Sequence, residues 1–134
     1  MNKPLVALLT ALSLGGCAVE PTTLQEETTY FAEWVGEEPV VGRNRLSLVL
    51  GTEGRAYGNA GCNHWFATYS LDGTQIDFSD VGSTRMACDP LIMKQENDFL
   101  DTLSRVERWD ISNTDQLRLW PNEGAPLRLW PAQE

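Results

Sequence analysis

The N-terminus carries a charged start, a short apolar run and two glycines ahead of a cysteine, and this pattern limits what the rest of the chain can fold into. Lys3 precedes an apolar run that starts near Leu5 and ends in Leu14-Gly15-Gly16-Cys17. This order is typical of a secretory signal, and the run is too short to span a bilayer. Removal of residues 1–16 leaves 118 of the 134 residues, which suits one domain with a single modest core.

The tetrapeptide that ends at Cys17 also resembles a bacterial lipobox. The resemblance implies that residues 1–16 are a lipoprotein signal peptide and that acylation of Cys17 attaches the protein to a membrane; a plain secretory signal is the alternative. Residues 18–29 are polar and without an apolar period, as in a flexible tether. The predicted organisation is therefore a signal peptide (1–16), a lipidated cysteine with its tether (17–29) and one domain (30–134).

Localisation follows from the residue after the lipidated cysteine. In similar lipoproteins an aspartate there often marks retention at the inner membrane, and this chain has Ala18. We therefore expect a bacterial envelope protein at the periplasmic face of the outer membrane.

The chain is strongly acidic. It has 19 Asp and Glu against 10 Lys and Arg, a formal net charge of −9, and Lys94 is the sole lysine after the signal segment. Nucleic-acid binding requires a clustered basic surface that displaces counterions from phosphates. The composition therefore argues against a nucleic-acid partner.

Short alternating segments separated by glycine predict an antiparallel sheet. Residues 30–35, 45–50 and 55–57 form the first set, and Gly51 to Gly54 supply a turn between the last two. Residues 65–71 and 74–78 flank Asp72-Gly73, and Asp-Gly between alternating segments is a strong hairpin signal.

A single helix is predicted over about residues 90–106. Asp89 is a good N-cap, and Pro90 suits the first helical position because it has no N–H to satisfy. Glu96 falls within the apolar stripe of this helix, where an unpaired charge is costly, so we expect it to have a partner. The fold class predicted is α+β, a small curled antiparallel sheet, partly barrel-like, packed against one helix.

The C-terminal part contains a five-residue repeat, Leu117 to Pro121 and Leu127 to Pro131, and a predicted strand over residues 108–112 precedes it. We interpret the two copies of this repeat as the strands of one hairpin. Side-chain alternation requires like faces to oppose each other. A five-residue loop then predicts Leu119 opposite Leu129. It also predicts two outward cation–π pairs, Arg118 with Trp130 and Arg128 with Trp120.

Cys62 and Cys88 are the two thiols that remain once Cys17 is acylated. An even remainder in an oxidising compartment favours a disulfide, whose 27-residue loop corresponds to about 3.5 kcal/mol in the chain-entropy model. The alternative is a nucleophilic cysteine assisted by His64, two residues after Cys62. A sulfur held in a disulfide cannot attack a substrate.

No other pattern predicts chemistry. His64 is the sole histidine, whereas metal sites usually need several N or S ligands. The chain lacks both a G-x-S-x-G stretch and an EF-hand pattern. We therefore predict no catalytic residues, no metal and no cofactor.

The five tryptophans divide into two groups. Trp34, Trp65 and Trp109 lie in apolar or alternating segments and are predicted to be buried. The other two lie on the hairpin face opposite the leucines. With two arginines they are a candidate partner-docking patch, because aromatic residues and arginine are enriched in binding hot spots; a structural ladder is the alternative. The patch comprises Arg118, Trp120, Arg128 and Trp130.

Three segments together resemble the META domain of the HslJ family. They are Gly58 to Asn63, Thr84 to Cys88, and Gln95-Glu96 ahead of Phe99. The similarity covers about residues 34–129. Ala67 departs from the glycine common after the Gly-Cys-Asn step, and the opening strand is short. The resemblance assigns as signature residues Gly58, Gly61, Cys62, Asn63, Thr84, Met86, Ala87, Cys88 and Glu96.

The resemblance implies a small α+β protein, often secreted or lipid-anchored, that is associated with envelope or heat stress and has no known reaction. We interpret the signature as structural. The glycines permit backbone angles that other residues resist. Glu96 is expected to accept hydrogen bonds from the Thr84 to Ala87 backbone or to pair with Arg85.

The function predicted is that of a non-enzymatic envelope lipoprotein that binds or stabilises another envelope component under stress. A periplasmic protease inhibitor acting through its glycine-rich loops is the alternative. An enzyme would need a pocket with perturbed carboxylates or a free thiol.

Overall fold

The computed structural model describes residues 15–16 and 23–133. Cys17, residues 1–14 and residues 18–22 lie outside this part of the chain, so the signal peptide and the lipidation remain predictions. No helix in the described part is both long and apolar enough to cross a membrane.

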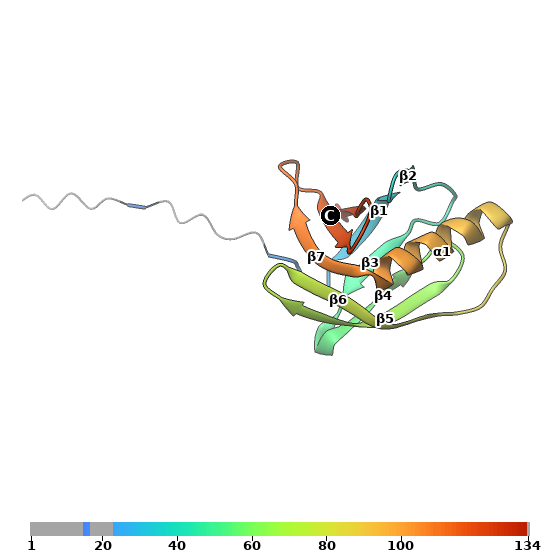
Figure 1. The fold of residues 1–134 in the computed structure, drawn as a ribbon, viewed down its shortest axis with the longest axis horizontal. Helices are drawn as coiled ribbons and strands as arrows, with labels where there is room; N and C mark the ends of the chain where they lie inside the picture. The colour runs from blue at the N-terminus through green and yellow to red at the C-terminus, as the bar shows by residue number, and fades with distance from the viewer. Residues whose placement is uncertain (1–14, 17–22, 134) are drawn as a thin grey trace, which may run out of the picture.

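Nine strands and one α-helix make up the described fold (Figure 1). The helix α1 spans Pro90–Ser104, and the 3₁₀ turn η1 spans Thr52–Gly54. The strands are β1 Thr29–Val35, β2 Glu38–Pro39, β3 Ser47–Leu50, β4 Arg55–Asn59, β5 His64–Asp72, β6 Gln75–Ser83, β7 Val106–Ile111, β8 Leu117–Pro121 and β9 Leu127–Pro131.

The strands form one antiparallel sheet that closes into a barrel. The order is β1-β3-β4-β5-β6-β7-β8-β9, β9 pairs with β1, and the short β2 pairs outside this ring with β1. The β6–β7 seam is the weakest, with Gln75–Arg108 as its one ladder pair. The helix contacts β6, β8, β9 and β1, so it packs on the barrel beside this seam (Figure 1). The predicted α+β class, with a curled sheet against one helix, is confirmed.

Alternate side chains of most strands fill the barrel, and Trp65 is the largest of the fully buried ones. The Trp65 ring packs edge-to-face on Phe78 and on Phe99 of α1, with ring centroids 6.5 Å and 5.9 Å apart. Its Nε1 donates to the Ser47 carbonyl at 2.9 Å. Because both phenylalanines are buried, each contributes about 1.5–3 kcal/mol through burial, and together they hold the helix against the sheet.

The helix begins as the sequence predicts and ends earlier. The Asp89 carboxylate caps it by accepting from the backbone N–H groups of Leu91 and Ile92 at 3.0 Å and 3.3 Å. The expected end at Val106 is wrong by two residues, because Arg105 leaves helical geometry and Val106 starts β7. Val106 is buried as a strand residue.

Burial of the tryptophans follows the prediction at two of the three positions. Trp65 and Trp109 are buried. Trp34 is half-buried, since β1 has a register shift between Ala32 and Trp34. A bulge of this kind turns a side chain partly out of the alternation.

The packed part of the chain also extends upstream of Tyr30. Leu24 is buried in the core cluster. The Glu27 N–H donates to the Leu50 carbonyl, and the Glu27 carboxylate accepts from the Thr52 N–H. Residues that the sequence assigns to the tether therefore pack against β3 and η1.

Candidate functional site

The signature segments meet where the β4–β5 loop, the stretch after β6 and α1 come together. At their centre is Glu96, which is 2% exposed. Its Oε2 accepts from the backbone N–H groups of Cys62 and Asn63 at 3.0 Å and 2.7 Å, and its Oε1 accepts from Asn63 Nδ2 at 2.6 Å. The helix carboxylate therefore fixes the loop between β4 and β5.

Asn63 links this loop to the segment after β6. Its Oδ1 accepts from the Met86 N–H at 2.6 Å and from Thr84 Oγ1 at 3.0 Å, and its Nδ2 also donates to the Met86 carbonyl at 3.0 Å. The expectation that Glu96 binds the Thr84 to Ala87 backbone or Arg85 is wrong. Asn63 lies between the Glu96 carboxylate and the segment after β6, and it makes the hydrogen bonds to Thr84 and Met86. Arg85 is exposed.

Two glycines are required by this geometry. A Cβ on Gly58 would lie 2.0 Å from the Ser47 carbonyl oxygen, so β3 and β4 could not approach as they do. Gly61 has a φ of +110°, a backbone conformation that favours glycine. It directs the next two N–H groups toward Glu96.

Cys62 and Cys88 form a disulfide, as their even count predicts, with the Cα atoms 6.0 Å apart. The bond joins the β4–β5 loop to the residue before the helix cap. Ala87, between Met86 and Cys88, is exposed. Every buried side-chain N or O atom among residues 15–16 and 23–133 has a hydrogen-bond partner. The polar groups of the signature are thus occupied by contacts within the protein.

The remaining polar features of this region are an exposed histidine and a surface hollow. His64 is exposed, and its backbone N–H donates to Thr84 Oγ1 at 3.2 Å. Within the described ranges no three His, Cys, Asp or Glu residues gather where they could hold a metal ion. A shallow hollow of about 410 Å³ beside Met86 and Glu96 has the carboxylate in its wall, but those oxygens already accept from protein N–H groups.

The second candidate site is the outer face of the C-terminal hairpin, whose predicted register is wrong by two residues. Leu117 pairs with Leu129, Leu119 with Leu127, and Arg118 with Arg128. The predicted inward face of the hairpin is correct, because its four leucines are buried. The predicted cross-strand pairs of Arg118 with Trp130 and Arg128 with Trp120 are therefore absent from the described hairpin.

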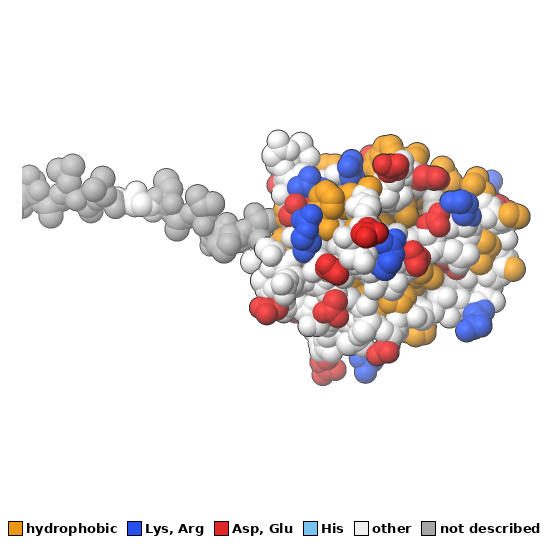
Figure 2. Space-filling model, in the orientation of Figure 1, with side chains coloured by type: hydrophobic (Ala, Val, Ile, Leu, Met, Phe, Trp, Pro, Cys, Tyr) orange, Lys and Arg blue, Asp and Glu red, His pale blue; other side chains and the backbone are white. Residues whose placement is uncertain are grey.

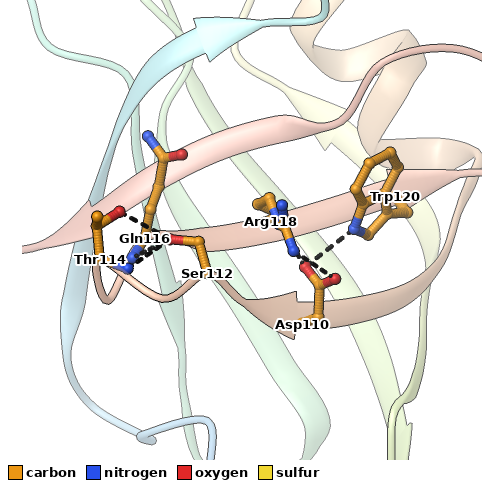
Figure 3. A network of polar contacts seen from close by, with 6 residues as sticks. All are labelled: Asp110, Ser112, Thr114, Gln116, Arg118 and Trp120. Carbon is orange, nitrogen blue, oxygen red and sulfur yellow. Dashed lines mark hydrogen bonds and ion pairs between the residues drawn. The ribbon is translucent and has the colours of Figure 1, made fainter.

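Arg118 and Trp120 instead both contact Asp110 of β7 (Figure 3). Arg118 donates to its two oxygens from Nε and Nη2 at 2.7 Å and 2.8 Å, and Trp120 donates from Nε1 at 3.0 Å. Burial raises the pKa of Asp110, but these hydrogen bonds and the Arg118 and Arg108 charges outweigh it, so that the pKa lies below its ordinary value. Arg108 also stacks on the Trp120 ring, 4.5 Å from its centroid.

The next turn of the chain supports this arrangement. Ser112 Oγ accepts from the N–H groups of Thr114 and Gln116 at 3.3 Å and 3.1 Å, which closes the β7–β8 turn (Figure 3). The turn fixes the register in which Asp110 meets Arg118.

Trp130 is held differently, by residues of β1. Its Nε1 donates to the Glu33 carboxylate, and its backbone pairs directly with Phe31. The Arg45 guanidinium lies 3.7 Å from the Phe31 ring centroid. Both tryptophans of the hairpin are therefore half-exposed and fixed by a carboxylate.

These residues share the outer surface of β7, β8, β9, β1 and the segment before β3, which we name the arginine–aromatic face. Figure 2 shows basic and hydrophobic side chains side by side over the region of β7. Sequence reasoning found four of the members and missed the others, because strand neighbours decide which alternate residues meet. The face comprises Phe31, Glu33, Arg45, Arg108, Asp110, Arg118, Trp120, Arg128 and Trp130.

The chain is similar to solved structures of the same fold. An NMR structure of a protein from Burkholderia xenovorans matches 90% of this chain and 97% of that protein, with a TM-score of 0.66 and 21% sequence identity. A second NMR structure matches 78% of this chain and 88% of its own, with a TM-score of 0.62 and 21% identity. No curated protein matches significantly.

At 21% identity these two structures show only that the fold is shared. The family is shown by a family model. The model, described as META domain, matches residues 22–134. The match covers every strand and the helix. The chain belongs to the META domain family.

Proposed function

We propose that this protein is a non-enzymatic envelope lipoprotein. A lipid on Cys17 holds it at the periplasmic face of the outer membrane, and the arginine–aromatic face binds or stabilises another envelope protein under stress. The observation that carries the proposal is the pair of half-exposed tryptophans, Trp120 and Trp130, each fixed by a carboxylate on a neighbouring strand.

Fixed aromatic side chains suit a binding surface. Ordering a free side chain at an interface costs about 0.5–1.5 kcal/mol, and Trp120 is already ordered by Asp110 and by the stacked Arg108. Aromatic and arginine side chains that bury well contribute most to protein interfaces. The surface is thus ready to bind before a partner arrives.

The signature supports a structural role. Its carboxylate accepts three hydrogen bonds from one loop, and its cysteines are joined to each other. A nucleophile needs a free thiolate and a general base needs a carboxylate or imidazole within reach of substrate. We therefore assign the signature to folding and the outer face to binding.

The inhibitor alternative gains no specific support. An inhibitory loop must project from its scaffold into a protease cleft. Of the glycine-containing loops between strands, the one from Ala60 to Asn63 is buried against the helix and does not project.

The experiment places a photoreactive amino acid at position 128 in the full-length lipoprotein and cross-links living cells before and after heat stress. We expect a discrete protein adduct that disappears in Trp120→Ala/Trp130→Ala. The matched control, Tyr57→Ala/Phe66→Ala, removes two exposed aromatic side chains from β4 and β5 and should keep the adduct. An adduct that survives the tryptophan changes contradicts the proposed face.

The lipid anchor has its own test. Cells given radioactive palmitate should label the wild-type protein and leave Cys17→Ala unlabelled. Equal palmitate labelling of the two proteins contradicts the lipid anchor.

A further inference from the structure

A hollow lies beside the Phe31–Trp130 pair of the arginine–aromatic face. Its volume is about 680 Å³, and Phe31, Arg45, Asp115 and Trp130 are among the side chains that line it. A second hollow of about 420 Å³ also has Phe31, Arg45 and Trp130 in its wall. Arg45 and the aromatic pair therefore separate two concave surfaces, each large enough for one or two side chains of a bound segment.

Arg45 is prepared to bind an anion. Its guanidinium is 3.7 Å from the Phe31 ring centroid, and its side chain is exposed. None of the ion pairs among residues 15–16 and 23–133 involves Arg45. A guanidinium stacked on a ring keeps its in-plane N–H donors free, and these match the two oxygens of a carboxylate.

Trp130 contributes an apolar surface. Its indole N–H is already donated to Glu33, so a ligand meets the ring and has no N–H to satisfy. Together with Phe31 it makes a two-ring surface beside the Arg45 charge. Such a surface suits an apolar side chain that lies next to a carboxylate in a partner's sequence.

Charge on this face differs from that of the whole molecule. The chain has 19 acidic and 10 basic residues, yet the arginine–aromatic face carries four arginines and two carboxylates. Both carboxylates are engaged, Asp110 by Arg118 and Trp120, and Glu33 by Trp130. Arg45 and Arg128 form no ion pair in the described part of the chain, so the face is complementary to an acidic partner.

We infer that this hollow is the docking site for an acidic, extended segment of the partner protein, with a carboxylate bound by Arg45 and an adjacent apolar side chain on Phe31 and Trp130. The inference rests on the proposed function and specifies the chemistry of the partner. Asp115 lines the same hollow. It disfavours a uniformly anionic surface such as a bilayer and accepts from the backbone N–H of a peptide.

The test titrates the mature chain carrying Cys17→Ser with the peptide Ac-Ala-Glu-Phe-Glu-Ala-NH2. The indole N–H signals in ¹H–¹⁵N spectra are followed, and that of Trp130 is assigned by its loss in Trp130→Phe. We expect saturable movement of the Trp130 signal and binding at least tenfold weaker for Ac-Ala-Gln-Phe-Gln-Ala-NH2. The same loss is expected in Arg45→Gln, since hydrogen bonds between charged groups are the strong ones.

The control variant is Arg55→Gln. Arg55 is an exposed arginine of β4, outside the face, and the change removes the same charge from the protein. Binding within twofold of the wild type is expected for this variant. Equal loss in Arg45→Gln and Arg55→Gln overturns the inference, because net charge would then account for the effect.

Two further outcomes overturn it. One is that the wild type shows no binding when the peptide concentration reaches about 10 mM, because a dissociation constant above that value is too weak for useful recognition. The other is Arg45-dependent binding to anionic phospholipid vesicles in place of the peptide. Cross-linking that still depends on Trp120 and Trp130 while peptide binding ignores Arg45 leaves the proposed function intact and rejects this inference alone.

Discussion

Replacing Glu96 by glutamine should destabilise the fold although the two side chains have the same shape. The carboxylate accepts three hydrogen bonds, from the N–H groups of Cys62 and Asn63 and from Asn63 Nδ2. Glutamine can offer its oxygen to the two backbone donors, but its NH2 group then faces Asn63 Nδ2. Two donors meet, and one buried hydrogen bond is lost.

Asn63 cannot rotate its amide to restore the match. Its Oδ1 accepts from the Met86 N–H at 2.6 Å and its Nδ2 donates to the Met86 carbonyl at 3.0 Å, so a flip reverses both bonds. An unsatisfied buried donor costs about 1–3 kcal/mol, and the two bonds that remain lose their charge assistance. The sum predicts a loss of about 2–4 kcal/mol in the free energy of unfolding.

The assay is urea unfolding of the mature Cys17→Ser chain with the disulfide intact, followed by tryptophan fluorescence. The unfolding midpoint should fall in Glu96→Gln with the slope unchanged. Asp98→Asn is the control, since it makes the same change on an exposed position of α1 that pairs with Lys94, and its midpoint should match the wild type. A Glu96→Gln midpoint equal to that of Asp98→Asn refutes the reasoning.

Three further predictions concern the disulfide, the outer face and the β3–β4 contact. Cys62→Ala/Cys88→Ala should lose about 3.5 kcal/mol in the free energy of unfolding by the chain-entropy model, and reduction of the wild type should lower its midpoint to the same value; equal midpoints for the oxidised wild type and the variant contradict this. Because the pKa of Asp110 is lowered by its hydrogen bonds against the effect of burial, its stabilisation is present above the unfolded pKa and is lost as the pH falls through the folded one. The difference in thermal midpoint between the wild type and Asp110→Asn should therefore shrink in acid, and a difference that is constant with pH argues against the clamp. Gly58→Ala should lose about 3 kcal/mol or more, since its Cβ would lie 2.0 Å from the Ser47 carbonyl oxygen; a midpoint like that of the wild type in urea unfolding contradicts this contact.

Local signals in the sequence predicted the elements that depend on near neighbours. The helix begins at Pro90 because Asp89 caps it, and the β5–β6 hairpin turns at Gly73, whose φ is +60°. The disulfide follows from the even count of thiols together with the expectation that the chain is exported. These features are set by adjacent residues or by composition, so they can be inferred before the fold is known.

Features that depend on distant strands could not be inferred in the same way. Alternation fixed which residues of the C-terminal hairpin face outward, but a slip of two residues preserves that alternation. The partner of β9 outside the hairpin is β1, where Trp130 pairs with Phe31 and donates to Glu33, and no pattern within the hairpin sequence reveals those contacts. Closure of the barrel depends on the pairing of β1 with β9, which lie at opposite ends of the domain sequence.

In the candidate sites, too, local features could be predicted and contacts between distant segments could not. Glu96 was expected to need a partner because it lies in an apolar stripe, and the structure supplies Asn63 and the β4–β5 loop. Arg45 was missed, since its contact with Phe31 crosses from the segment before β3 to β1. No spacing within the sequence brings those two residues together.

We propose a division of roles in which the signature residues build the fold and the arginine–aromatic face binds the partner. The most direct measurement compares Glu96→Gln with Trp120→Ala/Trp130→Ala in two readings, the urea midpoint of the purified protein and the cross-linked adduct in cells, normalised to folded protein. We expect Glu96→Gln to lower the midpoint and keep the adduct, and the tryptophan variant to lose the adduct with little change in midpoint. A folded Glu96→Gln protein without its adduct, together with a tryptophan variant that retains it, rules out this division of roles.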